Sequence, residues 1–256
     1  MARVFVTGST QGVGRNAAEA LLAAGHEVIL HARDAERAET LGGLAARARV
    51  LTGDLASLAQ TRALSLDLNA IGRVDAIIHN AGVMDDARAE TPDGLPRVLM
   101  VNALAPYVLS LLADQPRRLI FTGSSMHRGH SRVMEDLEWT RRRWSGSQAY
   151  GESKLLVTAL SAGLARRLPG APCNTVDPGW VPTRMGGPSA SDPLDQAHVT
   201  QCWLAASDDP AAQESGAYWR HMRRQPPDPK VSDPDFQDEV IARFAALSGV
   251  AAQASP

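Results

Sequence analysis

The sequence predicts an α/β fold in which helices cover both faces of one doubly wound parallel sheet, within a single domain. Over residues 1–180, short β-branched runs alternate with longer Ala- and Leu-rich stretches, as strands alternate with crossover helices in a parallel sheet. The short runs are continuously apolar, which is typical of strands buried on both faces. A glycine-rich turn at residues 7–14 joins the first run to a helix-forming segment, as in a βαβ unit.

The elements follow from these patterns in chain order. The strand candidates are Val4–Val6, Val28–Leu30, Val50–Leu51, Ala76–Ile78, Leu119–Phe121 and Asn174–Val176, and the helix candidates span about 13–24, 35–46, 57–70, 95–113 and 148–168. Stretches rich in Pro, Gly, Ser and Asp predict loops at 182–193 and 224–234. Around them we expect helices at about 193–207 and 235–247 and a last strand at 217–219. We expect one domain over residues 1–250 and a frayed tail over 251–256.

Composition excludes several classes of protein. The chain has 256 residues, 26 basic and 28 acidic side chains and a net charge of -2, so no positive field exists to attract nucleic acid. Its cysteines, Cys173 and Cys202, are too few for a disulfide framework, and the seven histidines show no metal-ligand spacing. The chain shows neither a signal peptide nor an apolar stretch long enough to span a membrane. We therefore expect a cytoplasmic protein without a metal.

The turn at residues 7–14 has the composition of a phosphate-binding turn. Glycine removes the side chain that would hold a pyrophosphate away from the main chain. The N-terminus of the following helix supplies free N–H groups and a partial positive charge. Because a strand precedes the turn and a helix follows it, we expect a dinucleotide site of the Rossmann type. Its residues are Gly8, Thr10, Gln11, Gly12, Val13 and Gly14.

The end of the second strand bears on which dinucleotide is bound. NAD-binding proteins usually place an acid there for the ribose hydroxyls, whereas an arginine pairs with the 2′-phosphate of NADP. Ala32 occupies the expected acid position and Arg33 follows it, which favours NADP. The alternative is that Arg33 lies on a solvated turn and Asp34 holds the ribose one residue later.

Further motifs follow in order along the chain. Asn80-Ala81-Gly82 follows the fourth strand, Ser124-Ser125 follow the fifth, and Tyr150–Lys154 has the form YxxxK. Asn102 lies in an expected helix, and Pro178–Thr183 has the form PGxVxT. With the TGxxxGxG turn, these motifs make residues 3–185 resemble the short-chain dehydrogenase/reductase family. The segment between the serines and Tyr150 is longer than in most of that family, as in the branch of retinol dehydrogenases and carbonyl reductases.

The YxxxK spacing has a chemical consequence of its own. Tyr150 and Lys154 are one helical turn apart, so both side chains emerge on one face. A free phenol has a pKa of about 10, and an adjacent ammonium favours the phenolate. We expect Lys154 to lower the pKa of Tyr150, which then acts as the acid or base on a carbonyl or alcohol.

The resemblance implies roles for the remaining residues. Ser125 would orient the substrate oxygen, with Ser124 as the alternative, Asn102 would steady a proton path through Lys154, and Lys154 would also bind the nicotinamide ribose. Asp54 would contact the adenine, although a helix N-cap is the alternative role for it and Ser57 suits that role as well. The expected cofactor-binding set is completed by Leu55, Asn80, Ala81, Gly82, Tyr150, Pro178, Gly179, Val181 and Thr183.

The insert at about 126–147 is expected to form one wall of the substrate mouth. Trp139 and Trp144 stack on an apolar substrate, or they fix the insert to the domain. Residues 141–143 are arginines that attract an anionic substrate, or they form a solvated face.

The sequence as a whole predicts an NADP-dependent oxidoreductase that interconverts a carbonyl and an alcohol. The alternatives are a non-catalytic dinucleotide sensor or interaction module, and an epimerase or enoyl reductase on the same fold. The expected partner is a small carbonyl or alcohol substrate. The family also includes homodimers and homotetramers built through the helices at 95–113 and 148–168, and monomers.

Overall fold

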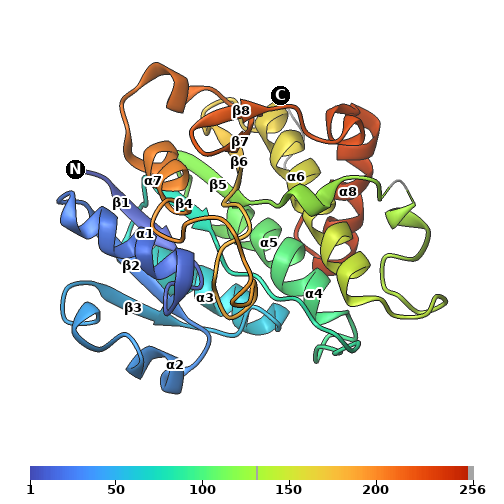
Figure 1. The fold of residues 1–256 in the computed structure, drawn as a ribbon, viewed down its shortest axis with the longest axis horizontal. Coiled ribbons are helices and arrows are strands. Elements are labelled where there is room, and N and C mark those ends of the chain that lie inside the picture. The colour runs from blue at the N-terminus through green and yellow to red at the C-terminus, as the bar shows by residue number, and fades with distance from the viewer. Residues whose placement is uncertain (131, 253–256) are drawn as a thin grey trace.

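The computed structural model describes residues 1–130 and 132–252, and over that part the chain forms one α/β domain around a single sheet. The eight strands described there lie in the order β3-β2-β1-β4-β5-β6-β7-β8 (Figure 1). Neighbouring strands pair in parallel from β3 to β7, and β8 pairs antiparallel with β7. The predicted fold class is confirmed.

All six predicted strands are present, and so is the last one, displaced by one residue. The bounds are β1 (Arg3–Val6), β2 (Glu27–Ala32), β3 (Arg49–Thr52), β4 (Ala76–His79), β5 (Arg118–Thr122), β6 (Cys173–Asp177), β7 (Tyr218–Arg220) and β8 (Arg223–Gln225). The strand β8 falls partly in a segment predicted to be a loop, and that prediction is wrong there. Its residues are all exposed, so its sequence lacks an apolar pattern, and a tight turn returns the chain onto β7.

The helices match the predictions at their centres more closely than at their ends. They are α1 (Gly12–Ala23), α2 (Ala35–Glu39), α3 (Leu58–Ile71), α4 (Arg97–Leu99), α5 (Ala105–Leu112), α6 (Gly146–Arg167), α7 (Val199–Ala206) and α8 (Pro234–Ser248). The helix expected at 35–46 ends early, and a short 3₁₀ turn follows at Gly42–Leu44, where Gly42 has a φ of +55°. The helix expected from 193 begins only at Val199. A π-helical turn, Met100–Leu104, joins α4 to α5.

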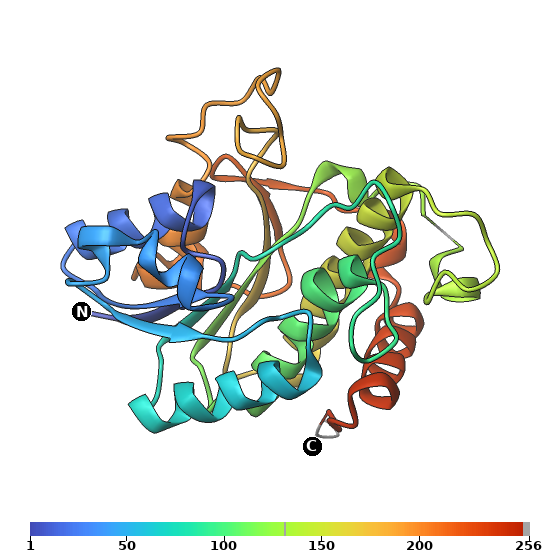
Figure 2. The same ribbon diagram turned by 90° about the horizontal axis from the view of Figure 1, so that it is seen from below.

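Helices cover the sheet on both faces, as the continuous apolar strands predicted. Helices α1 and α7 lie on one face, and α3, α5 and α6 lie on the other (Figure 2). In β1, Val4 and Val6 belong to the core cluster of the first face, whereas Phe5 belongs to the cluster of the second. Alternate residues of one strand therefore need to be apolar for different reasons, because each face has its own core.

The helix α8 packs against the outer side of α6 (Figure 1). The Tyr107 ring of α5 meets Phe244 of α8 with ring centroids 5.8 Å apart, and its hydroxyl donates to the Val250 carbonyl at 2.6 Å. A Cβ added at Gly163 of α6 would lie 2.7 Å from Ile241, so the two helices are in close contact. In this chain α8 therefore covers this side of α5 and α6, the helices through which family members can form dimers or tetramers. Assembly through that side would require α8 to move.

Among the described residues, no helix is both long and apolar enough to cross a membrane. Over the same residues, no group of three or more His, Cys, Asp or Glu side chains is arranged to hold a metal ion. Residues 253–256 of the predicted tail lie outside the described part of the chain.

Candidate active site

The predicted site residues gather at the carboxyl edge of the sheet. The phosphate-binding turn follows β1, Asn80 follows β4, Ser124 follows β5 and Pro178 follows β6. Because these strands are parallel neighbours, their carboxyl ends open on the same side. The segment after β6 rises above this edge as a long loop, drawn in orange (Figure 2).

The phosphate-binding turn packs directly on the segment after β4. Gly8 has a φ of +65°, and a Cβ there would lie 2.9 Å from the Cα of Ala81. The Asn80 side-chain amide donates to the Thr7 carbonyl at 3.0 Å, and the Ala81 amide donates to the Thr7 hydroxyl at 3.0 Å. A Cβ at Gly14 would overlap the Asn80 amide. The glycines are therefore needed for close packing, and Asn80 and Ala81 hold the turn through their hydrogen bonds to Thr7.

The first turn of α1 is suited to an anion. Its N-cap, Gln11, makes no side-chain capping bond, and the first turn contains no acidic residue. The helices α2 and α3 differ, because Asp34 and Ser57 cap them by accepting from a backbone N–H. The first N–H groups of α1 thus lack a side-chain acceptor at the end where a phosphate is favoured. Gly12 also lies against the loop after β6, since a Cβ there would be 3.2 Å from the Thr183 methyl. The residues of this turn fit a dinucleotide phosphate.

Arg33 and Asp34 lie together at the end of β2. Arg33 Nε donates to an Asp34 carboxylate oxygen at 2.8 Å, and the other oxygen accepts from the Arg37 amide at 2.8 Å. These contacts lower the pKa of Asp34, chiefly through the Arg37 amide and then through Arg33. Both Asp34 oxygens are thus engaged within the chain. The Arg33 side chain keeps 55% of its surface exposed, which leaves the guanidinium accessible to a ligand.

Ser124, rather than Ser125, meets the tyrosine. The Ser124 hydroxyl lies close enough to the Tyr150 phenol to lower its pKa. Ser125 is exposed and begins a 3₁₀ turn. In this structure the alternative serine, Ser124, thus lies beside the phenol, and the choice of Ser125 as the catalytic serine stays a prediction. The pairing of β5 with β6 extends to Gly123, whose amide donates to the Val176 carbonyl at 2.8 Å.

Lys154 and Tyr150 are brought together, but not as a simple ion pair. Lys154 Nζ lies 5.5 Å from the centroid of the Tyr150 ring and donates to the Thr122 carbonyl at 2.8 Å. Burial raises the pKa of Tyr150 to about 12, against the effect of the Ser124 hydroxyl. Burial also lowers the pKa of Lys154 to about 8, while the Asp177 carboxylate acts in the opposite direction. The expectation that Lys154 lowers the pKa of Tyr150 is not met in this geometry, where burial and the Asp177 carboxylate raise that pKa and the Ser124 hydroxyl lowers it.

Asn102 links three parts of the site from the π-helical turn. Its side chain exchanges two hydrogen bonds with the Val83 backbone, at 2.8 and 2.9 Å, and donates to the Ser153 hydroxyl at 2.9 Å. Ser153 in turn donates to the Tyr150 carbonyl at 2.7 Å. A Cβ at Gly82 would lie 3.5 Å from Asn102 Oδ1 and 3.6 Å from Lys154 Nζ. The asparagine and the lysine therefore converge on Gly82, consistent with the π-bulges that recur at functional sites.

The other expected cofactor residues are placed with varying clarity. Asp54 accepts from the Ala56 amide at 2.9 Å, whereas Ser57 is the N-cap of α3. The Leu55 side chain is buried in the core, so only its backbone is available to contact a cofactor. Val181 is buried as well, while Pro178, Gly179 and Thr183 are partly exposed along the loop after β6.

Comparison with known proteins decides the family. Residues 8–211 match a family model described as enoyl-(acyl carrier protein) reductase. The chain is 38% identical over 255 residues to the short-chain dehydrogenase chyC of Penicillium rubens, covering 98% of both chains. The chain belongs to the short-chain dehydrogenase/reductase family. It is also 30% identical over 288 residues to human retinol dehydrogenase 13, covering 97% of this chain and 85% of that one.

Solved structures of low sequence identity share the fold. A crystal structure of a protein from Mycobacterium paratuberculosis superposes with a TM-score of 0.83 at 24% identity, covering all of this chain, 100%, and 95% of the other. A blue fluorescent protein from a metagenomic library, solved with NADPH, gives a TM-score of 0.71 at 24% identity, covering 86% of this chain and 95% of that one.

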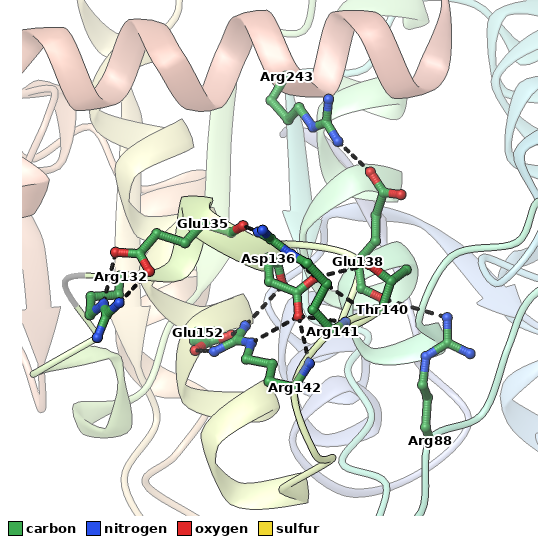
Figure 3. A network of polar contacts seen from close by, with 10 residues as sticks. All are labelled: Arg88, Arg132, Glu135, Asp136, Glu138, Thr140, Arg141, Arg142, Glu152 and Arg243. Atoms are coloured by element: carbon green, nitrogen blue, oxygen red, sulfur yellow. Dashed lines mark hydrogen bonds and ion pairs between the residues drawn. The ribbon is translucent and has the colours of Figure 1, made fainter.

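In this short-chain dehydrogenase/reductase, the insert is fixed to α6, the helix that carries Tyr150 and Lys154 (Figure 3). Arg142 donates to both carboxylate oxygens of Glu152 at 2.6 Å, and Glu152 lies in the YxxxK motif. The guanidinium carbon of Arg142 is 3.8 Å from the centre of the Trp139 ring, which is 5% exposed. Asp136 accepts hydrogen bonds from the backbone amides of residues 140–142. Trp139 and Arg142 therefore fix the insert in place and do not form a stacking or anion-binding surface.

Two contributors to the site escaped the sequence analysis. His31 lies beneath the phosphate-binding turn, and Asp177 accepts from the Gly179 amide at 2.8 Å and from the Tyr218 hydroxyl at 3.1 Å. Both are polar side chains at the end of a buried strand. That placement is the signal that identifies them, because a polar residue there is costly unless it has a partner.

Loss of the Arg142 side chain should destabilise the fold more than loss of an exposed arginine. Arg142→Met leaves the buried Glu152 carboxylate without its partner, so we expect the free energy of unfolding to fall by about 2–3 kcal/mol. Arg132→Met removes the exposed pair with Glu135 and should cost less than about 1 kcal/mol. Urea unfolding of both variants measures the difference. Equal losses would show that the Arg142–Glu152 pair does not fix the insert.

Proposed function

We propose that the protein is an NADP(H)-dependent oxidoreductase that interconverts a carbonyl and an alcohol by hydride transfer. The observation that carries the proposal is the grouping of Ser124, Tyr150 and Lys154 at the carboxyl edge of the sheet, next to a glycine turn suited to a dinucleotide. The name of the relative retinol dehydrogenase 13 describes the oxidation of an alcohol, which supports this reaction class.

Tyr150 is the proton donor in the reductive direction. A phenol with a pKa raised to about 12 stays protonated near neutrality and has a proton to give as negative charge develops on the substrate oxygen. The Ser124 hydroxyl, close to the phenol, lies where it can donate to the same oxygen and stabilise it. Bound NADPH supplies the hydride.

The residues that would hold the cofactor divide along its length. The first N–H groups of α1, from Gly12 to Gly14, would bind the pyrophosphate. Lys154, with a pKa lowered to about 8, remains mostly protonated at pH 7 and would bind the nicotinamide ribose, with Asn102 beside it. Asp54 would meet the adenine end.

The preference for NADP rests on Arg33. Its guanidinium is the exposed cation at the end of β2, and Asp34 is already engaged in capping α2. The NADPH complex of the blue fluorescent protein supports the same cofactor on a similar fold. A guanidinium pairs with a phosphate through two parallel N–H bonds, which a ribose hydroxyl does not offer.

The substrate mouth is apolar and adaptable. Met84, Met126 and Met185, which follow β4, β5 and β6, are all exposed large apolar side chains, at 38%, 41% and 43%. The Met185 methyl would lie 3.9 Å from a Cβ at Gly82, beside the point where Asn102 and Lys154 converge. Flexible thioether side chains adapt to irregular apolar surfaces and favour aromatic rings. We therefore propose a bulky apolar ketone or alcohol as the substrate.

Two other functions use the same fold and are separated by simple assays. The matched family model is described as an enoyl reductase, so enoyl substrates belong in any panel with ketones and aldehydes. A non-catalytic dinucleotide sensor would bind NADPH without oxidising it in the presence of any of these compounds.

The cytoplasmic location stays a prediction. Both cysteines, Cys173 and Cys202, are free in the structure.

Replacing the phenol should separate binding from turnover. Tyr150→Phe removes the proton donor but keeps the ring, so we expect turnover to fall by a factor of about 10³ or more and NADPH affinity to change less than about threefold. Carbonyl reduction is followed through the absorbance of NADPH, and binding through its fluorescence. Near-parental turnover of the variant would contradict the catalytic role of Tyr150.

The neighbouring serines provide a matched comparison. Ser124→Ala removes the hydroxyl that meets Tyr150, and we expect kcat to fall by about 10²-fold. Ser125→Ala alters an exposed hydroxyl one residue away, and kcat should stay within about twofold. A large fall in kcat for Ser125→Ala, with little change for Ser124→Ala, would identify Ser125 as the catalytic serine. It would also show that cofactor binding changes the positions of the two serines.

Cofactor choice is tested at Arg33. Arg33→Ala should raise the dissociation constant of NADPH by about 10-fold or more and leave that of NADH within about twofold, because only NADPH offers a 2′-phosphate. Fluorescence titration of both cofactors gives the ratio. Equal weakening of the two would remove Arg33 from the basis of selectivity.

A further inference from the structure

We infer that the His31 side chain is a positioning residue for the dinucleotide, joining the phosphate-binding turn to the adenine-side segment through one buried ring. The inference rests on the proposed binding of NADP(H), but it concerns a residue to which that proposal gives no role. His31 is the residue before Ala32 at the end of β2 and is 2% exposed.

The sheet register brings His31 between the two segments. Leu30 pairs with Val6, so His31 lies beside the start of the phosphate-binding turn, and His31 itself pairs with Leu51, two residues before Gly53. The Gly8 amide donates to His31 Nδ1 at 3.0 Å. On the other side, His31 Nε2 lies 2.8 Å from the Gly53 carbonyl oxygen.

These contacts fix the state of the ring. Nδ1 accepts a hydrogen bond from Gly8, so it carries no proton, and Nε2 must carry the proton that it donates to Gly53. Burial lowers the pKa of His31 and so favours this neutral form, although Asp54 and the Gly53 hydrogen bond oppose the shift. The ring meets the Phe5 ring edge-on at 6.2 Å between centroids, which restricts its orientation further.

The backbone of His31 holds the turn independently of the ring. The Ser9 hydroxyl accepts from the His31 amide at 2.8 Å, and the Ser9 amide donates to the His31 carbonyl at 3.2 Å. Loss of the imidazole would therefore leave the turn attached to β2. What would be lost is the restraint on the Gly8 amide and on the Gly53 carbonyl, two groups that become unpaired inside the domain.

Both groups adjoin places where the cofactor would bind. Gly8 begins the phosphate-binding turn with a φ of +65°, and its amide direction sets the path of the residues that lead to α1. Gly53 precedes Asp54, so the direction of its carbonyl sets the start of the adenine-side segment. One ring thus fixes the spacing between the proposed pyrophosphate and adenine contacts. Tyr150, on α6, and Ser124, after β5, belong to a different part of the site.

The test measures NADPH binding directly on the full chain. We expect His31→Leu to raise the dissociation constant of NADPH by about 10-fold or more, while kcat at saturating NADPH stays within about twofold. An asparagine amide reaches about as far as Nδ1, and a glutamine amide about as far as Nε2. His31→Asn and His31→Gln should each keep one of the two bonds and weaken NADPH by less than His31→Leu does.

His79→Leu is the matched control. His79 is about as buried, in β4, and its ring bonds Ser110 and stacks on Phe121 rather than on Gly8 or Gly53. This variant should lose thermal stability comparably and keep its NADPH affinity within about twofold. The inference is overturned if His31→Leu binds NADPH within twofold of the parent, if all three His31 variants bind equally, or if His79→Leu weakens binding as much. A parent chain that binds neither NADPH nor NADH would overturn the proposed function itself.

Discussion

The removal of Lys154 from water is the constraint on which the rest of the site depends. An ammonium that is 2% exposed costs several kcal/mol unless polar groups replace its hydration. The Thr122 carbonyl, at 2.8 Å, provides one such group, and the nearby Asp177 carboxylate opposes the fall in the pKa of Lys154. Asp177 is itself held by the Gly179 amide and the Tyr218 hydroxyl. Lys154 is thus bonded to the end of β5, while Asp177, whose charge it feels, joins the ends of β6 and β7.

The same loss of water gives Tyr150 its chemical character. Burial raises the pKa of the phenol and so keeps it protonated near neutrality, as the proposed reduction of a carbonyl requires. The helix α6 that carries Tyr150 and Lys154 is held from several sides, by α8, by Asn102 through Ser153, and by the insert through Glu152. A phenol whose helix is fixed in this way is preorganised, as the proposed acid catalysis requires.

Sequence patterns located much of the fold and many of the site segments for a clear reason. Strands buried on both faces must be apolar throughout, so β1, β2 and β4 were visible as runs. Exposed β8 was missed because hydrogen bonding to β7, and not side-chain burial, makes it a strand. The sequence left Ser124 and Ser125 both open, because which of the two faces Tyr150 depends on how the chain leaves β5. Trp139 and Arg142 were open to two interpretations because their partners, including Glu152, come from another element.

The sequence by itself determined which chemical groups are present and in what order the parallel sheet brings them to one edge. The glycine turn and the Tyr150–Lys154 pair follow from spacing and residue type, whereas Asn102 was chosen through the resemblance to the family. The tertiary structure alone decided that Ser124 meets the phenol, that burial sets the pKa values of Tyr150 and Lys154, and that His31 joins two cofactor segments. These properties depend on strand register and on distance from water, and both are set only when elements remote in the sequence pack together.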